Sequence, residues 1–208
     1  MVFSTSPFIR TLRAVRVIAC VLSLSLVWQS SVAQTDATIP SREIVRPNVV
    51  LLLADDLGFS DIAPYGSEIS TPHLTALAEN GVSFTNYHTA ANCAPARAML
   101  LTGVDSHLAG VPNIPEMIPP VQQHADHYQG VLGQDVVTVA TLLQTAGYHT
   151  YMAGKWHLGQ TPGLLPSSRG FERTVALGES GADNWEQKPY LPIYDKANWY
   201  ADGKEYQL

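Results

Sequence analysis

The chain has 208 residues, of which 46% are hydrophobic and 14% charged, and its formal net charge is −6. This composition excludes an intrinsically disordered chain and indicates a globular protein. The negative balance argues against nucleic acid as a partner, and it means that an anionic ligand would have to be bound by local cations.

The first 33 residues have the features of a secretory signal peptide. Three arginines precede an apolar stretch at 17–28, and Ser31-Val32-Ala33 supplies small residues before a cleavage point. The stretch is too short for a comfortable membrane span. Cleavage would release the protein to the periplasm or the exterior, and it would remove Cys20. Cys93 would then be the only cysteine, so no disulfide could form within the chain.

A polar lead-in at 34–46 is followed by alternating β and α segments. This alternation is typical of an α/β fold with a mostly parallel sheet flanked by helices. The apolar run at 48–54 does not alternate with polar residues, so it predicts a strand buried on both faces. Asp55 and Asp56 follow directly, at the carboxyl end where open α/β sheets bind ligands. Adjacent carboxylates there favour a hard cation such as Ca²⁺ or Mg²⁺, although a simple turn is the alternative.

A helix is predicted next, with Thr71 as its N-cap, Pro72 as its first residue and Gly81 after its end. Its buried side is expected to carry three apolar residues, namely Leu74, Leu77 and Ala78. A strand is then predicted at 82–87.

The segment from Cys93 to Gly103 reads as a short helix, with Pro95 suited to a first helical position and Gly103 able to end it. On such a helix Cys93 and Arg97 are four residues apart and share one face. The helix dipole and the guanidinium would both favour negative charge at position 93. This favours a site for an anion, whereas a cysteine taken alone is more often simply buried.

A loop at 104–134 follows, and loops of this length are commonly functional. A helix at 139–146 with Thr138 as cap is predicted to lead into a strand at 148–153, which would deliver Lys155 and His157 at its end.

Basic residues are scarce in the middle of the chain. Between Val49 and Gln160, Arg97 and Lys155 are the only lysine or arginine residues. Because each of these two cations lies within a motif-like segment, we expect both to be functional rather than ordinary surface charges.

Two further features could bind a ligand, but for each we prefer an interpretation without a functional role. His124 and His127 have a spacing that a transition metal could use, but we expect solvated or pocket histidines. The aromatic residues after Gly178 could stack on an aryl or sugar group, but packing within an irregular loop is favoured. A hairpin turn is predicted at 201–204.

Three segments together resemble the type I sulfatases. Cys93 to Gly103 is similar to their first signature, Gly147 to His157 to their second, and Pro47 to Asp56 to their opening strand with its paired aspartates. The resemblance runs from about residue 47 to at least residue 171, in the order found in the family. Single phrases within it, such as Leu57-Gly58-Phe59-Ser60-Asp61, are most similar to bacterial arylsulfatases.

The resemblance implies a hydrolase of sulfate esters or sulfated glycans. Cys93 would be oxidised to formylglycine by a maturation enzyme that reads Pro95 and Arg97. One hydroxyl of the hydrated aldehyde would attack sulfur, and the other would later expel sulfate from a covalent sulfo-enzyme intermediate. Asp55, Asp56 and residue 93 would bind Ca²⁺, or alternatively Mg²⁺. Three further roles are implied: Arg97 would hold the diol, Lys155 would contact sulfate, and His157 would assist the second hydroxyl.

The family's downstream Asp-Asn pair, histidine and lysine have no match before Leu208. Residues 47–208 are therefore interpreted as the N-terminal portion of a sulfatase catalytic domain, C-terminally incomplete, with little or no turnover by itself. Two alternatives stay open: hydrolysis of phosphate or phosphonate esters by the same architecture, and a non-catalytic remnant.

Overall fold

The computed structural model describes residues 46–208, which divide into one unit ending at Leu52 and a second unit of residues 53–208. The predicted signal peptide at 1–33 and nearly all of the lead-in at 34–46 lie outside the described residues. Residues 46–52 belong to the first unit; they are exposed and form neither helix nor strand. Among the described helices, none has the length and apolar character needed to cross a membrane.

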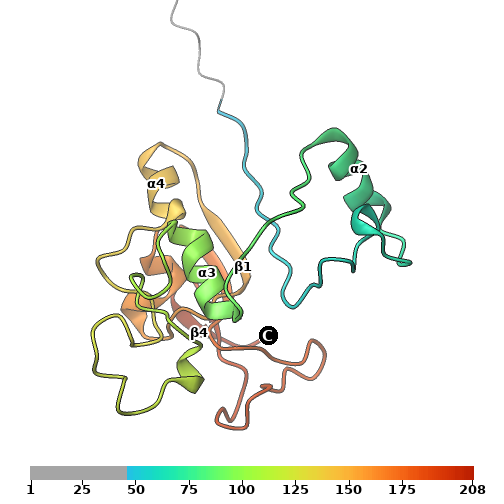
Figure 1. Cartoon of the computed structure of the whole chain (residues 1–208). Helices are drawn as coiled ribbons and strands as arrows, with labels where there is room; N and C mark the ends of the chain where they lie inside the picture. The colour runs from blue at the N-terminus through green and yellow to red at the C-terminus, as the bar shows by residue number, and fades with distance from the viewer. Residues whose placement is uncertain (1–45) are drawn as a thin grey trace, which may run out of the picture. The chain divides into compact units, whose positions relative to one another are not determined.

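The second unit contains all the helices and strands of the described chain (Figure 1). Its α-helices are α2 (Pro72–Asn80), α3 (Cys93–Thr102) and α4 (Val139–Thr145). Its strands are β1 (Tyr151–Lys155), β2 (Arg173–Leu177), β3 (Trp199–Ala201) and β4 (Lys204–Tyr206). Four single-turn 3₁₀ helices connect them: η1 (Ala63–Tyr65), η2 (Pro115–Met117), η3 (Pro162–Leu164) and η4 (Pro166–Ser168).

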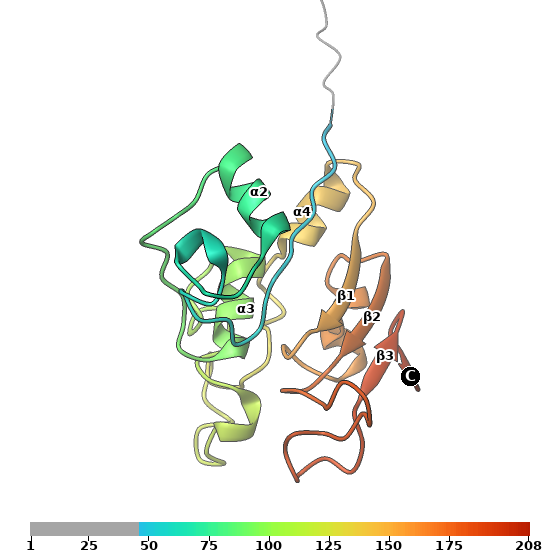
Figure 2. The same cartoon turned by 90° about the vertical axis from the view of Figure 1, so that its right-hand side faces the viewer.

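The four strands form one mixed sheet in the order β1-β2-β3-β4 (Figure 2). β1 and β2 run parallel, whereas β2–β3 and β3–β4 are antiparallel. Sheet and flanking helices confirm the α/β class, but the described sheet is mixed and not mostly parallel, since only the β1–β2 pairing is parallel. The hairpin predicted at 201–204 is also confirmed: Asp202 and Gly203 both have positive φ, of 47° and 82°, as a two-residue type I′ turn requires.

Two predicted strands are absent from the described structure. Residues 48–54 and 82–87 form no strand, and Val50 and Val82 are each 79% exposed. An apolar run satisfies the side-chain requirement of a buried strand, but a strand also needs a neighbour to pair its backbone groups. No described residue supplies that neighbour to either segment.

The observed helices agree with the sequence-based predictions better than the strands do. α2 begins at Pro72 as predicted, but its apolar stripe is wrong, since Leu74 and Leu77 are 38% and 63% exposed. α3 begins at Cys93, two residues before Pro95. It ends as predicted at Gly103, whose φ of 68° lets its N–H bond the carbonyl of Met99.

The cap of α4 and the strand that follows were also predicted. The Thr138 hydroxyl accepts a hydrogen bond from the Thr141 N–H at 3.2 Å, which confirms the cap. β1 begins three residues later than expected and runs to Lys155, so Lys155 closes the strand and His157 lies two residues beyond it.

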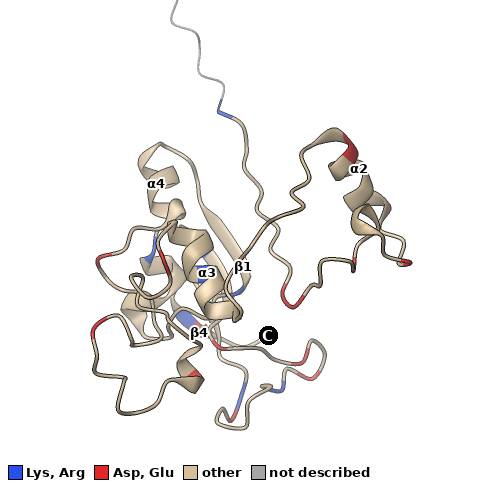
Figure 3. Cartoon of the chain, in the orientation of Figure 1, with Lys and Arg blue, Asp and Glu red and all other residues tan. Residues whose placement is uncertain are grey.

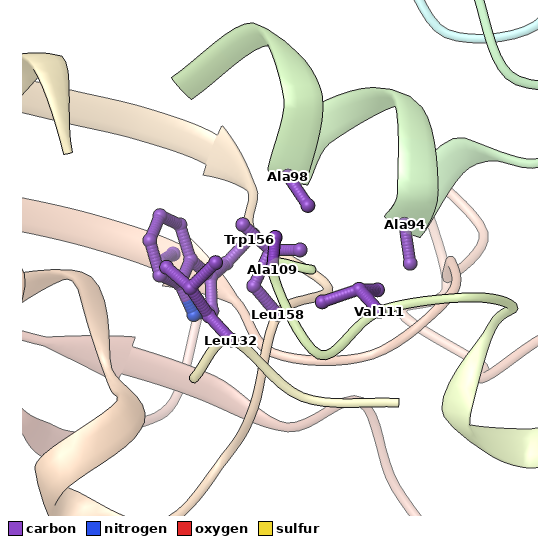
Figure 4. Packing of buried hydrophobic residues seen from close by; sticks show 8 residues of the cluster. Ala94, Ala98, Ala109, Val111, Leu132, Trp156 and Leu158 are labelled. Carbon is purple, nitrogen blue, oxygen red and sulfur yellow. The ribbon is translucent and has the colours of Figure 1, made fainter. Parts of the chain in front are cut away.

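The core joins α3 to the segment after β1 (Figure 4). Ala94 and Ala98 on α3 are fully buried against a cluster that also contains Ala109, Val111, Leu132, Trp156, Leu158 and Ala176. Small residues on α3 let the helix approach closely, which brings the start of α3 next to the end of β1. This packing assembles the candidate site.

Candidate active site

Cys93 and His157 are in contact although 64 positions separate them in the chain. Cys93 is the first residue of α3 and is half-buried, and its Sγ lies 3.3 Å from Nδ1 of His157. The His157 side chain is fully buried, and its φ of 57° is a left-handed conformation that few non-glycine residues adopt. The sequence placed both residues in the site, and the structure brings them together.

Arg97 and Lys155 meet at Asp55. Arg97 Nη2 lies 3.1 Å from Asp55 Oδ1, and Lys155 Nζ lies 2.8 Å from Asp55 Oδ2. Arg97 also donates through Nη1 to the backbone carbonyl of Lys155 at 2.7 Å, and its side chain is only 9% exposed. Lysine and arginine are few among the described residues (Figure 3), and the carboxylate of Asp55 contacts both Arg97 and Lys155. In this structure Arg97 contacts Asp55 and the strand end rather than Cys93.

Asp56 lies apart from this network. It is exposed, has a φ of 56°, and forms no hydrogen bond or ion pair with another described residue. Asp56 therefore stays a predicted metal ligand, and among the described residues only Asp55 contacts the two cations.

The donors available to a divalent metal have the right chemistry but are too few. The carboxylates of Asp55 and Asp56 are hard oxygen ligands, as Ca²⁺ and Mg²⁺ prefer. Both Asp55 oxygens accept from cations, though each retains lone-pair capacity. Across residues 46–208, no group of three or more His, Cys, Asp and Glu side chains is arranged to hold a metal.

Glu116 and Tyr194 extend the site, and the sequence analysis missed both. His157 Nε2 lies 3.0 Å from Glu116 Oε2, and the Tyr194 hydroxyl donates to Glu116 Oε1 at 2.8 Å. A signal for Glu116 existed: it is the only charged residue in the proline-rich segment 111–120, in which Asn113 is the only other polar residue. No comparable signal marks Tyr194, which lies among several aromatic residues.

Electrostatics within the site follow from these contacts. Burial raises the pKa of the Cys93 thiol, but its hydrogen bond with His157 and the charge of Lys155 outweigh burial and bring that pKa to about 7. Burial lowers the pKa of His157, but its bonds to Cys93 and Glu116 raise it above the ordinary value. The pKa of Glu116 is lowered, because the bond to His157 outweighs the effect of its burial. The arrangement favours a thiolate beside an imidazolium.

Glu179 is a second buried acid close to this group. It is fully buried, Oε2 accepts from Asn198, and Oε1 has no hydrogen-bond partner among the described residues. Burial accordingly raises its pKa.

The two loop histidines and the aromatic residues after Gly178 differ in their surroundings. His124 and His127 are exposed, and His127 bonds only the carbonyl of Leu108, as expected of loop histidines. Among the aromatic residues after Gly178, Trp185 lines a pocket of about 610 Å³ and is 91% exposed, whereas Tyr194 contacts Glu116 and Trp199 donates to Gln187 within the same segment.

The sequence model of the sulfatase family matches residues 47–206. This chain belongs to the sulfatase family. Among curated sulfatases, it is 39% identical over 165 residues to the arylsulfatase of Klebsiella aerogenes, a match that covers 78% of this chain and 35% of that protein. It is 45% identical over 150 residues to an uncharacterized sulfatase of Schizosaccharomyces pombe, covering 71% and 27% respectively. The chain thus spans about a third or less of these sulfatases.

Solved structures agree with this assignment. The crystal structure of Ps i-CgsB superposes with a TM-score of 0.60 at 30% identity, covering 77% of this chain and 37% of that one. A second crystal structure of Ps i-CgsB, in complex with k-i-k-neocarrahexaose, gives a TM-score of 0.56 at 29% identity, covering 73% and 35%. The fold of about three quarters of this chain therefore recurs in these solved structures.

Proposed function

We propose that the protein acts in sulfate ester hydrolysis, with formylglycine derived from Cys93 as its reactive residue. The observation that carries this proposal is the contact between Cys93 Sγ and His157 Nδ1, beside the Arg97–Asp55–Lys155 network. A half-buried thiol with a pKa of about 7 at the first residue of a helix suits a position that must carry an oxyanion after conversion.

Each neighbouring side chain has a role that its position supports. Lys155, 12% exposed and held by Asp55, would present its ammonium to a sulfate oxygen. Buried His157 would exchange a proton with the side chain at 93. Arg97 would fix Asp55 and the end of β1, and through them the distance between the two cations. Formylglycine would supply a hydrated aldehyde, with one hydroxyl to attack sulfur and one to release sulfate from the covalent sulfo-enzyme.

Asp55, Asp56 and the oxygen of converted residue 93 would hold Ca²⁺ or Mg²⁺, which would polarise a sulfate oxygen. Because Ca²⁺ takes about six to eight oxygen ligands, these donors need completion by others. We therefore expect weak metal binding and little turnover from the 208-residue chain by itself.

The substrate is proposed to be a small sulfate ester or a sulfated glycan. The names of similar proteins support this choice, since one is an arylsulfatase and the structure of another is a complex with k-i-k-neocarrahexaose. A formylglycine-generating enzyme is the proposed maturation partner, and the periplasm or exterior is the proposed location.

The test is co-expression with a formylglycine-generating enzyme, followed by mass analysis of the peptide that contains residue 93. We expect an aldehyde there, and an unmodified thiol would favour a non-catalytic remnant. The matured chain is then assayed with Ca²⁺ on 4-nitrophenyl sulfate and on matched phosphate monoester and diester, with Cys93→Ala as control. A preference for phosphate would reassign the reaction, and robust turnover of sulfate would contradict the expected weakness of the isolated chain.

A further inference from the structure

His157 has two ring nitrogens, and the proposed chemistry uses only one of them. Nδ1 faces Cys93, whereas Nε2 faces Glu116 Oε2 at 3.0 Å. We propose that Glu116, held by Tyr194, is a positioning residue that fixes the ring orientation and the protonated Nε2 of His157, so that Nδ1 is presented to residue 93. The catalytic meaning of this proposal rests on the proposed function, but the contact itself can be tested without turnover.

The chemistry of the carboxylate determines which nitrogen carries the proton. An ionised carboxylate only accepts hydrogen bonds, so the Nε2 that faces it must be protonated. Each oxygen of Glu116 faces a donor, Nε2 of His157 at 3.0 Å and the Tyr194 hydroxyl at 2.8 Å, so both oxygens act as acceptors, as those of an ionised carboxylate do. Nδ1 is then left to accept a proton from the group at 93 or to return it. Without Glu116, either tautomer and a flipped ring would be available.

Burial protects the contact between His157 and Glu116 from competition by water. The side chain of His157 is 0% exposed and that of Glu116 only 5% exposed, so water cannot readily replace either partner. A buried carboxylate needs hydrogen-bond donors, and Glu116 has one for each oxygen: His157 on Oε2 and Tyr194 on Oε1. Gln160 reaches the Tyr194 hydroxyl at 3.4 Å, which helps to set the position of that phenol.

The loop that carries Glu116 is tied to the helix that carries Cys93. Asn92, the residue before Cys93, donates to Asn113 Oδ1 at 2.6 Å, and the same oxygen accepts from the Ile114 N–H. Glu116 follows two residues later, within η2. Cys93 and Glu116 therefore lie on connected supports at opposite edges of the His157 ring, and the ring's position depends on both.

The structure offers a matched control pair elsewhere in the same chain. His149 Nδ1 lies 2.8 Å from Glu172 Oε2, a histidine–glutamate contact of the same kind. Here the histidine is 78% exposed and remote in sequence from both Cys93 and Glu116. Substituting Glu172 removes a carboxylate from a histidine without touching His157.

The experiment compares wild type with Glu116→Ala, Glu116→Gln, Tyr194→Phe and Glu172→Gln, using ¹⁵N-resolved NMR of the histidine side chains in the whole chain. We expect Nε2 of His157 in wild type to stay protonated in the neutral ring as well as in the imidazolium, so that Nδ1 is the nitrogen that gains or loses a proton with pH. Glu116→Ala should lose this signature, Tyr194→Phe should weaken it, and Glu116→Gln should keep part of it, because an amide oxygen still accepts from Nε2. Glu172→Gln should leave the His157 signals unchanged.

The isosteric Glu116→Gln and the conservative Tyr194→Phe keep the test informative if Glu116→Ala fails to fold. An unchanged His157 spectrum in folded Glu116 variants would overturn the proposal. In a matured protein with measurable turnover, kcat on 4-nitrophenyl sulfate should fall roughly 10- to 100-fold with KM little changed, by analogy with carboxylate partners of metal-bound histidines. If residue 93 stays an unmodified thiol after co-expression with the maturation enzyme, the proposed function fails, while the spectrum still decides the role of Glu116.

Discussion

At the scale of single residues, the environment of Cys93 makes it unlike an ordinary buried thiol. We predict that the unmodified chain is alkylated by iodoacetamide at Cys93 with a pH midpoint of about 7, because His157 and Lys155 stabilise the thiolate more than burial destabilises it. The rate is measured by mass analysis of the peptide that contains residue 93.

The same chain unfolded in urea provides the reference for that experiment, since it should show the higher midpoint of a free thiol. His157→Gln should shift the midpoint of the folded chain upward. A folded midpoint equal to that of the unfolded chain would mean that the contact with His157 does not exist in solution.

The Arg97 side chain makes two hydrogen bonds, one to Asp55 and one to the carbonyl of Lys155. Arg97→Ala leaves the carbonyl of Lys155 without its side-chain donor and removes one of the two cations from Asp55. We expect the free energy of unfolding to fall by about 1–3 kcal/mol, a range that allows for the solvent exposure of Asp55. Urea unfolding measures the change.

A second arginine–aspartate pair supplies the control for this prediction. Arg173 contacts Asp202 at 2.9 Å, but its side chain is 73% exposed. Arg173→Ala should therefore change stability little. Equal losses in the two variants would show that burial of Arg97 contributes nothing to the network.

At the scale of elements, α4 depends on its N-cap, Thr138, the residue before its first turn. The hydroxyl of Thr138 accepts from the Thr141 N–H and donates to the carbonyl of Arg169 at 2.6 Å, while the residue is 1% exposed. Thr138→Ala should lower the free energy of unfolding by about 1–2 kcal/mol, because a helix N–H and a buried carbonyl lose a partner.

Thr145→Ala is the matched substitution at the other end of α4. Thr145 is exposed, and its hydroxyl bonds only the Thr141 carbonyl within the helix. Alanine is the better helix former, so this variant should be close to neutral. Both variants are compared by urea unfolding, and a neutral Thr138→Ala would refute the cap as a stabilising contact.

Elements were predictable where the signal was local. Thr138, Pro72 and Gly103 marked helix boundaries correctly, because caps and terminators act within a few residues. The strands at 48–54 and 82–87 were wrong, because an apolar run does not reveal whether a partner strand is present.

At the scale of the whole described chain, the long loop at 104–134 contributes to the hydrophobic core. Leu132 lies near the end of that loop, is fully buried, and belongs to the same cluster as Ala94, Ala98 and Trp156 (Figure 4). Leu132→Ala should cost about 2–5 kcal/mol of stability, and it should loosen the packing that places α3 against the end of β1.

Leu142→Ala makes the same chemical change on α4, where the side chain is 61% exposed. It should change the free energy of unfolding by no more than about 0.5 kcal/mol. Thermal unfolding of both variants would measure the difference. Similar small effects would mean that the loop does not pack into the core in solution.

The sequence by itself determined the family, the α/β class and the identities of Cys93, Arg97, Lys155 and His157 as site candidates. It could do so because motif residues and their order are local properties of the chain. Only the tertiary structure decided that Asp55 contacts both cations while Asp56 does not. It alone also decided that Glu116 bonds His157 and that Tyr194 bonds Glu116. Those contacts join residues that are 41 to 100 positions apart in the sequence. They form because small residues on α3 pack against the core, and a local sequence pattern does not reveal such packing.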